Sequence, residues 1–451
     1  MVSCLILLAD RTICQNSNRP NIIFILVDDQ GWADFGESII PGCPEASSHY
    51  LETPQLNKIA ESSLVFTDAY APAPICTPTR RSLLYGMTPA RQKGTEFKGF
   101  FNPKGHKAIP QYLKEVDESY QCAVFGKWGE TMDGTSNKVG EANKLINPEA
   151  LHFDESDGRY TGNKTGGLYP NPHWKRNKMS AEDYKIEKEQ FNKNYYVEPE
   201  EDPKRTNSLT EKSINFIKKQ KRQKSPFYLQ LNYYAIHTGY RATLESIDKY
   251  SDKANPERRL LRGIGPVLDE LDQAIGKILN SVEEMGLSEN TYIFISSDNG
   301  GEGIHSPPWS NKKMPNRNFP LRDVKGSLYE GGIRVPFIVK GPGIKKGFIA
   351  EPISLIDLLP TFYELAGGKK KLSSQIDGTS IVPLLFESPK NDFMRGEYGL
   401  IFHRPFWGRQ SHSAIRKGDY KLVVTWGETA DIKKKELFYL RYDLGEENDL
   451  S

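Results

Sequence analysis

The sequence predicts an α/β protein in which a large mixed, mostly parallel sheet is flanked by helices, with a small C-terminal antiparallel sheet subdomain. Three observations predict this class. Four short apolar runs are of the kind that forms strands buried on both faces of a parallel sheet. Segments with helical periodicity of their apolar residues separate some of these runs. After about residue 367 the pattern changes: Ser413–Val424 predicts a hairpin that turns at Lys417-Gly418-Asp419, and Leu437–Leu444 predicts another strand. We therefore expect one large domain followed by a smaller one.

The length and charge of the chain exclude several classes of function. A chain of 451 residues can bury a substantial core. Its net charge of +2 gives no broad electrostatic case for a nucleic acid or membrane partner. The apolar run Val2–Ala9 is broken by Asp10 and Arg11 and is too short to span a bilayer. It fits a signal-peptide remnant or leader over residues 1–19, or a non-native start, and we favour export to the periplasm or the extracellular space.

The cysteines do not show a metal-binding or disulfide framework. They are Cys4, Cys14, Cys43, Cys76 and Cys122. No pair has C-x-x-C spacing, and the odd count argues against a complete set of disulfides. The pairing of Cys43 and Cys122 stays open.

The first and fourth apolar runs each end in residues that offer oxygen ligands. NIIFILV ends in Asp28-Asp29, and adjacent carboxylates repel each other unless a cation lies between them. TYIFISS ends in Asp298-Asn299 and two glycines, which allow the backbone to approach a ligand closely. A solvated loop and a plain Asn-Gly turn are the structural alternatives. The occurrence of both pairs favours a metal site.

The second and third apolar runs are followed by a lysine and a histidine. YQCAVF precedes Lys127, and PFYLQLNYY precedes His237. Alone, each residue is more often a surface lysine or a structural histidine. Ligand sites in open parallel sheets, however, lie beyond the carboxyl ends of the strands. We therefore expect the groups that follow all four strands to converge at one edge.

Four segments have the pattern of helices. They are Thr53–Ser63, with a Thr cap and Pro at its first position, Ser208–Lys219, Arg262–Met285 and Ser354–Ala366. The third is the longest and should pack on one face of the sheet. In the fourth, Ser354 and Asp357 have the spacing of a capping box.

The stretch around Cys76 combines a thiol, a helix start and a cation. Ala71–Pro74 is rich in proline and cannot be helical, whereas the chain is compatible with a helix from Thr79 until Gly86. We therefore expect Cys76 just before a helix N-terminus, where free N–H groups favour anions, with Arg80 one turn further on. This arrangement suits a nucleophile for a negatively charged substrate. A small buried residue near a turn is the alternative.

The sequence Cys76-Thr77-Pro78-Thr79-Arg80, followed by Leu84-Tyr85-Gly86, resembles the signature of the type I sulfatases of the alkaline phosphatase superfamily. Matching pieces occur in family order along nearly the whole chain. The resemblance implies that a maturation enzyme converts Cys76 to formylglycine, an aldehyde that works as its hydrate. It also implies a metal site formed by Asp28, Asp29, Cys76, Asp298 and Asn299, and sulfate contacts from Lys127 and Lys325.

The resemblance further implies a mechanism for hydrolysis of a sulfate ester. The hydrate at position 76 attacks sulfur, with the metal and Arg80 polarising the nucleophile. His237 is the favoured general acid toward the departing alcohol. Ligands that are all oxygen indicate Ca²⁺ or Mg²⁺, and we favour Ca²⁺ because the family often uses it.

Two positions depart from the family pattern. Gly129 stands where the family commonly has a histidine that contacts the formylglycine hydroxyls, and Ile236 replaces a proline before His237. We expect Glu130 or a bound water to serve as the base for sulfate release. Two other functions remain open: a phosphoester or phosphonate hydrolase of the same superfamily, and a non-catalytic protein that binds sulfated glycans.

The expected domain organisation places the substrate between two units. Residues 20–367 form the catalytic domain, with a polar insertion at 134–204 that contains a helix near Ala181–Asn192, and residues 368–451 form the C-terminal subdomain. The family usually continues into a terminal helix, so a truncated end is compatible with the pattern. We expect a sulfated saccharide as substrate, with His305, Arg404 and Trp407 as its contacts. The alternative is that Arg404 and Trp407 merely pack the domains together.

Overall fold

The computed structural model describes residues 19–96, 101–128, 147–157, 198–251, 253, 261–303, 316–386, 393, 395–405 and 411–451. Its centre is an eight-stranded sheet with the strand order β11-β2-β10-β9-β1-β7-β4-β5. The bounds are Gly347–Ile349 (β11), Leu64–Phe66 (β2), Phe337–Lys340 (β10), Thr291–Ser297 (β9), Asn21–Val27 (β1), Phe227–Asn232 (β7), Gln121–Gly126 (β4) and Glu155–Ser156 (β5).

The four strands predicted from the apolar runs lie next to one another. β1 pairs in parallel with β9 on one side and with β7 on the other, and β7 pairs in parallel with β4. Among the described strands of this sheet, β10 alone runs antiparallel to its neighbours. The carboxyl ends of the four strands therefore share one edge of the sheet, as the sequence predicted.

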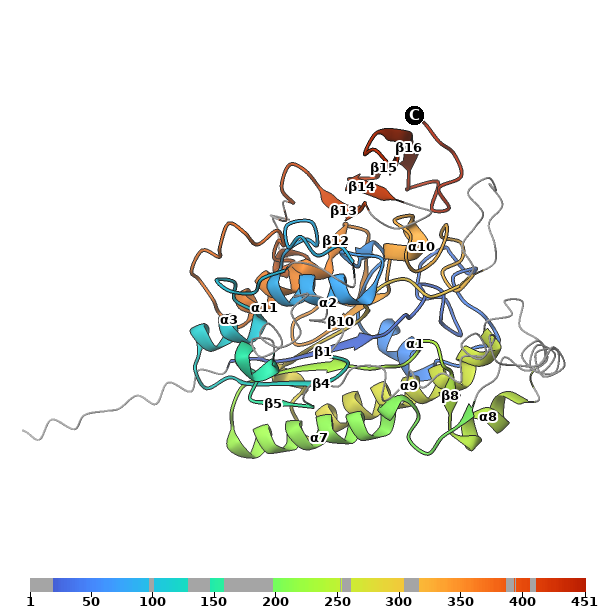
Figure 1. Cartoon of the computed structure of the whole chain (residues 1–451). Coiled ribbons are helices and arrows are strands. Elements are labelled where there is room, and N and C mark those ends of the chain that lie inside the picture. The colour runs from blue at the N-terminus through green and yellow to red at the C-terminus, as the bar shows by residue number, and fades with distance from the viewer. Residues whose placement is uncertain are drawn as a thin grey trace, which may run out of the picture.

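Helices cover both faces of this sheet (Figure 1). One layer holds α1 (Pro54–Glu61), α7 (Thr206–Gln223), α8 (Leu244–Ser251) and α9 (Leu261–Glu284); the other holds α2 (Cys76–Tyr85), α3 (Ile109–Val116), α11 (Leu358–Leu365) and α12 (Val382–Leu385). Alternate residues of β1 pack into the two layers: Ile23, Ile25 and Val27 into the first, and Ile22, Phe24 and Leu26 into the second. This explains why the strand is apolar at every position.

The predicted helices are present, with shifted bounds. The segment expected at 208–219 extends over Thr206–Gln223. The segment expected at 354–366 begins as a 3₁₀ helix, Leu355–Asp357, before α11. Its capping box is confirmed, because the Ser354 N–H donates to Asp357 Oδ2 at 2.7 Å. The short helix α10 (Glu330–Ile333) and the 3₁₀ helices Pro148–Leu151, Pro203–Arg205 and Ser288–Asn290 complete the described helices.

The C-terminal subdomain is a four-stranded antiparallel sheet, as predicted (Figure 1). Its strands are β13 (Leu400–Arg404), β14 (His412–Lys417), β15 (Tyr420–Trp426) and β16 (Ile432–Tyr439), paired in sequence order. The hairpin between β14 and β15 turns at Gly418-Asp419, close to the predicted turn. The last strand, expected over Leu437–Leu444, instead spans Ile432–Tyr439. Its first half is exposed and carries three lysines, so the pattern of apolar residues did not predict it.

Two short pairs complete the described strands: β3 (Ala69–Tyr70) with β12 (Ile353–Ser354), and β6 (Glu198–Pro199) with β8 (Arg241–Ala242). Part of the predicted insertion joins the main fold, because β5 pairs with β4 at the edge of the large sheet. The helix expected at 181–192 lies outside the described residues, as does the leader except for its last residue. Among the described residues, no helix has the length and apolar character needed to cross a membrane.

Candidate active site

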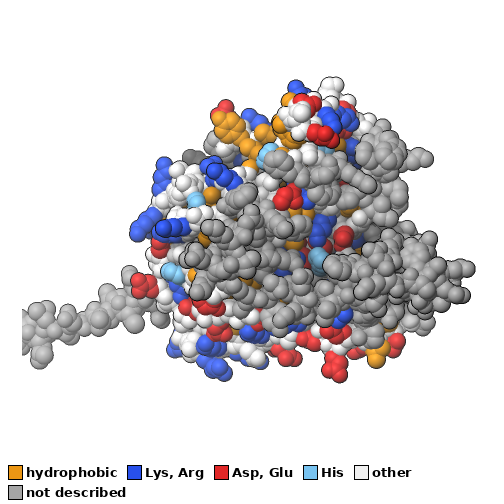
Figure 2. All heavy atoms as spheres, in the orientation of Figure 1, with side chains coloured by type: hydrophobic (Ala, Val, Ile, Leu, Met, Phe, Trp, Pro, Cys, Tyr) orange, Lys and Arg blue, Asp and Glu red, His pale blue; other side chains and the backbone are white. Residues whose placement is uncertain are grey.

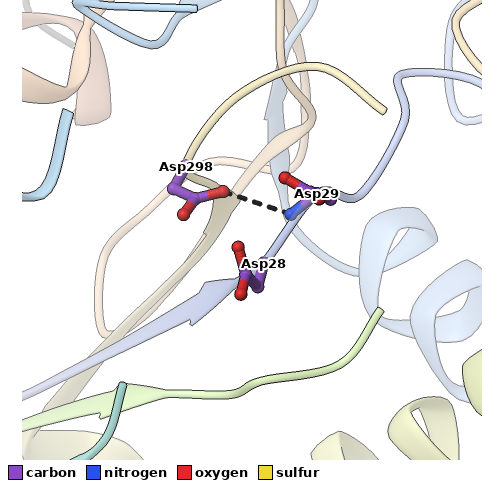
Figure 3. Close-up of side chains that lie close together, drawn as sticks. All are labelled: Asp28, Asp29 and Asp298. Atoms are coloured by element: carbon purple, nitrogen blue, oxygen red, sulfur yellow. Dashed lines mark hydrogen bonds between the residues drawn. The ribbon is translucent and has the colours of Figure 1, made fainter. Parts of the chain in front are cut away.

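Three carboxylates meet beyond the carboxyl ends of β1 and β9. Asp28 and Asp29 follow β1, Asp298 follows β9, and one oxygen of each lies within 4.8 Å of the others (Figure 3). All three are buried, and the Asp29 N–H donates to Asp298 Oδ1 at 3.1 Å. Asp29 has a φ of 63°, a costly conformation for a non-glycine residue. The backbone is therefore strained at Asp29, directly after β1, where the carboxylates meet.

This cluster fits a divalent cation. Asp28 Oδ1 and Asn299 Oδ1 are both buried and receive no hydrogen bond from the described residues, although buried polar atoms normally have a partner. The Asn299 amide nitrogen donates to Asp29 Oδ1 at 2.7 Å, which brings the fourth predicted oxygen ligand into the group. Hard oxygen donors of this kind suit Ca²⁺ or Mg²⁺. The set of close ligand atoms contains the three aspartates and does not include Cys76.

Three basic side chains neutralise the carboxylates. Arg80 lies 2.7–2.8 Å from Asp298 Oδ2 through two nitrogens and 3.7 Å from Asp28. Lys127 Nζ lies 2.7 Å from Asp28 Oδ2, and Lys325 Nζ lies 2.7 Å from both Asp29 oxygens. Burial alone would raise the pKa of Asp28, but Lys127, His237 and Arg80 hold it below its usual range. The site therefore combines fixed negative and positive charge in a buried volume.

Cys76 is the first residue of α2, and Arg80 follows one turn later on the same helix. The helix was expected from Thr79 and begins three residues earlier, with Ile75, in extended backbone, at the N-cap position. Cys76 is 2% exposed and interacts electrostatically with both Arg80 and Lys325. The thiol therefore lies near these two basic side chains, at a helix end where N–H groups favour anions.

His237 lies near the same carboxylates. Its loop after β7 is fixed on one side by Asp28, whose N–H donates to the Ala235 carbonyl at 2.9 Å and whose carbonyl accepts the Ile236 N–H at 2.7 Å. The imidazole Nε2 is 3.7 Å from Asp29 Oδ2, and the side chain keeps 30% of its surface exposed. Burial and the nearby Lys325 lower the pKa of His237. It is the most exposed of the side chains that the structure brings together here.

Near the centre of the face in Figure 2, acidic, basic and histidine side chains lie together.

Arg404 is buried, and its guanidinium binds other residues of the chain. It is 3% exposed, and its guanidinium donates to both oxygens of Glu96, at 2.7 and 3.1 Å, and to the Gly326 carbonyl at 2.6 Å. The structure therefore favours the alternative in which Arg404 links the two domains. His305 and Trp407 lie outside the described residues, as do Gly129 and Glu130.

Arg317 and Asn318 support the site and were not predicted. Arg317 donates to the Asp29 carbonyl at 2.8 Å and pairs with Asp34 at 2.6 Å. Asn318 accepts the Gly301 N–H at 2.7 Å and donates to its carbonyl at 3.0 Å. Both follow a long polar stretch without periodicity, so no sequence pattern marked them. They hold the turns that carry Asp29 and Asn299.

Comparisons with known proteins agree with this geometry. The sulfatase family model matches residues 20–368, and the model of the N-sulphoglucosamine sulphohydrolase C-terminal region matches residues 323–451. N-acetylgalactosamine-6-sulfatase of Rattus norvegicus is 28% identical over 90% of this chain and 72% of its own. A sulfatase of Formosa agariphila is 28% identical over 99% of this chain and 87% of its own.

A solved structure extends the comparison to three dimensions. The crystal structure of Ps i-CgsB in complex with k-i-k-neocarrahexaose superposes with a TM-score of 0.70 at 28% identity, over 96% of this chain and 89% of that one. The matched region of the family model spans the sheet, the acidic cluster and the Cys76 helix. The chain therefore belongs to the sulfatase family and is a sulfuric ester hydrolase with the alkaline phosphatase superfamily fold.

Proposed function

We propose that this enzyme hydrolyses a sulfate ester on a sulfated carbohydrate through a formylglycine made from Cys76. The observation that carries the proposal is the convergence of Cys76 and Arg80, at the start of a buried helix, with oxygen ligands and two lysines at one sheet edge. An anionic group entering this edge meets several fixed cations and a helix N-terminus. The saccharide part rests on the relatives, whose names include a carbohydrate sulfatase and a protein crystallised with a neocarrahexaose.

The residues of the chain divide the work. A Ca²⁺ or Mg²⁺ would be held by Asp28, Asp29, Asp298 and Asn299 and would supply positive charge to the site. The formylglycine hydrate would supply the hydroxyl that attacks sulfur and would later expel sulfate. Arg80 orients that hydroxyl, while Lys127 and Lys325 hold the sulfate oxygens.

His237 completes the set as the general acid. An alcohol of a sugar is a poor leaving group unless it receives a proton as its bond to sulfur breaks. His237 is positioned for this role because it lies at the acidic cluster yet keeps part of its ring exposed. A bound sulfate group favours the protonated imidazole, since a nearby negative charge raises the pKa of histidine.

The proposal includes a maturation enzyme as partner and export of the protein. Export is supported by the short apolar run near the N-terminus. The test uses protein that has been co-produced with a formylglycine-generating enzyme. Sulfate release is measured on sulfated sugars, including N-acetylgalactosamine 6-sulfate and a neocarrahexaose, beside an aryl sulfate and a phosphate monoester. Faster turnover of a sulfated sugar supports the proposal. Faster turnover of the phosphate ester, or binding of sulfated sugars without turnover, overturns it.

A further inference from the structure

Lys204 is a buried lysine close to the site, and the proposed chemistry leaves it without a role. Lys204 is 1% exposed, which is unusual for a lysine unless its ammonium group is paired with acceptors. Nζ donates to the backbone carbonyls of His237 at 2.8 Å and of Thr238 at 2.9 Å. Both carbonyls belong to the loop that carries the proposed general acid.

The backbone around Lys204 is held in a demanding conformation. Lys204 and Arg205 both have a φ of 56°, in the left-handed region that non-glycine residues rarely adopt. They lie at the end of the Pro203–Arg205 turn, directly before α7, which packs on β4 and β7. Such a conformation persists only where the surroundings fix it. Here the lysine side chain is directed inward to the carbonyls.

The loop that carries His237 is therefore fixed from two directions. Asp28, a proposed metal ligand, exchanges two backbone hydrogen bonds with Ala235 and Ile236. Lys204 binds the carbonyls of the next two residues along the chain, His237 and Thr238. Between these anchors the imidazole faces Asp29 at 3.7 Å. A shift of about 1 Å in such a group can cost roughly 100-fold in rate.

We propose that Lys204 is a positioning residue for His237: its ammonium fixes the loop so that the imidazole stands where it protonates the departing alcohol. The inference rests on the proposed role of His237 and adds a residue that no sulfatase signature in the sequence marked. Lys204 does not contact the sulfate in this scheme. Its effect on the reaction passes through the two carbonyls to the ring.

The leaving group separates positioning from mere structural support. An aryl sulfate such as 4-nitrophenyl sulfate leaves as a stable phenolate and gains little from a proton, whereas a sugar alcohol depends on it. We expect Lys204→Met to lower kcat on the best sulfated sugar by roughly 10- to 100-fold. On 4-nitrophenyl sulfate we expect a loss of less than about threefold, and KM should change little on either substrate.

The experiment compares five forms of the matured protein with wild type: Lys204→Met, Lys204→Arg, His237→Asn, the Lys204→Met/His237→Asn double variant and Lys253→Met. Lys204→Arg keeps donors for the carbonyls and should recover most of the lost rate. The double variant should be no slower than His237→Asn alone, because both changes disable one step. Lys253→Met is the matched control, since Lys253 donates to the Tyr50 carbonyl at 3.0 Å and pairs with Glu52, outside the site.

Each outcome decides the inference. Equal losses on both substrates, or losses that multiply in the double variant, assign Lys204 to general stability and overturn the proposal. Wild-type rates in Lys204→Met do the same. If that variant does not fold, as judged by its melting temperature, Lys204→Arg and Lys204→Gln are compared by the same substrate ratio, and an unchanged ratio in both overturns it. If wild type releases no sulfate from any substrate, the proposed function itself has failed.

Discussion

Arg404 of β13 and Glu96 of the segment after α2 form an ion pair through both carboxylate oxygens. The same guanidinium donates to the carbonyl of Gly326, the residue after Lys325. Arg81 of α2 in turn donates to the carbonyls of Gly94 and Glu96. The C-terminal sheet is thereby tied to the helix that begins with Cys76 and to the turn that carries Lys325.

The first prediction follows from this pair. Arg404→Ala leaves the partly exposed Glu96 carboxylate and the Gly326 carbonyl without their donor, so we expect a loss of roughly 2–3 kcal/mol in the free energy of unfolding. Catalytic efficiency should fall by a similar factor on an aryl sulfate and on a sulfated sugar. The reason is that loss of the bond to Gly326 displaces the turn that carries Lys325, which contacts the sulfate group of either substrate in the proposed mechanism. Melting temperature and kcat/KM on both substrates provide the measurement. A selective loss on the sugar would instead restore Arg404 as a direct substrate contact.

The second prediction concerns Cys76. Cys76→Ala should lower turnover by at least roughly 10³-fold, as expected when a nucleophile is removed, while leaving the melting temperature nearly unchanged. Mass spectrometry of the tryptic peptide from matured wild type should show the aldehyde. The control is Cys122→Ala, in which a fully buried core thiol is removed and activity should persist despite lower stability. Full activity in wild type that carries only the thiol would contradict the formylglycine assignment.

The third prediction concerns the metal. A cation that binds only the folded protein stabilises it by mass action, by about 2.7 kcal/mol at a hundredfold excess over its Kd. Added Ca²⁺ should therefore raise the melting temperature of chelator-treated wild type and restore its activity. In Asp298→Asn the calcium-dependent rise should largely disappear. Asp419→Asn, which removes a surface partner of Arg441, should keep it. A rise of equal size in both variants would place the cation elsewhere.

Much of the fold and of the site followed from local sequence patterns. The four apolar runs predicted the adjacent parallel strands, and the parallel direction then brought Asp28, Lys127, His237 and Asp298 to one edge. This works because strand direction alone decides where the residue after a strand lies. The family resemblance added Lys325, which no strand pattern marked.

The parts that the sequence did not predict depend on contacts between distant segments. Arg317 reaches Asp29 across 288 positions of the chain, and Lys204 reaches His237 across 33. Neither residue lies in a periodic segment, and a lysine or arginine in a polar stretch looks the same whether it is solvated or buried. Arg404 illustrates the same limit, because only the folded chain shows that Glu96 already occupies its guanidinium.

The last prediction concerns a buried cluster of charges between the two domains. Lys421 of β15 lies 2.8 Å from a carboxylate oxygen of Glu330 and 2.8 Å from one of Glu446. Arg334 also pairs with Glu330, so the negative charge of Glu330 is balanced by two basic side chains. The charge of Glu446 is balanced less well, by Lys421. Burial raises the pKa of Glu446 to about 7, with Lys421 opposing the shift and Glu330 adding to it.

A raised carboxyl pKa has a defined effect on stability. Between the unfolded value near 4.5 and about 7, the folded protein keeps a proton that the unfolded chain has lost, so this group makes stability fall as pH rises through that window. Glu446→Gln resembles the protonated carboxyl at every pH. The variant should therefore match wild type near pH 4.5 and gain up to roughly 3 kcal/mol over it by pH 8. Calorimetric melting temperatures at steps of one pH unit measure the difference. Glu351→Gln, at an exposed carboxylate, should show none. A difference that shrinks as pH rises would mean that the ion pair with Lys421 outweighs the cost of burying the charge.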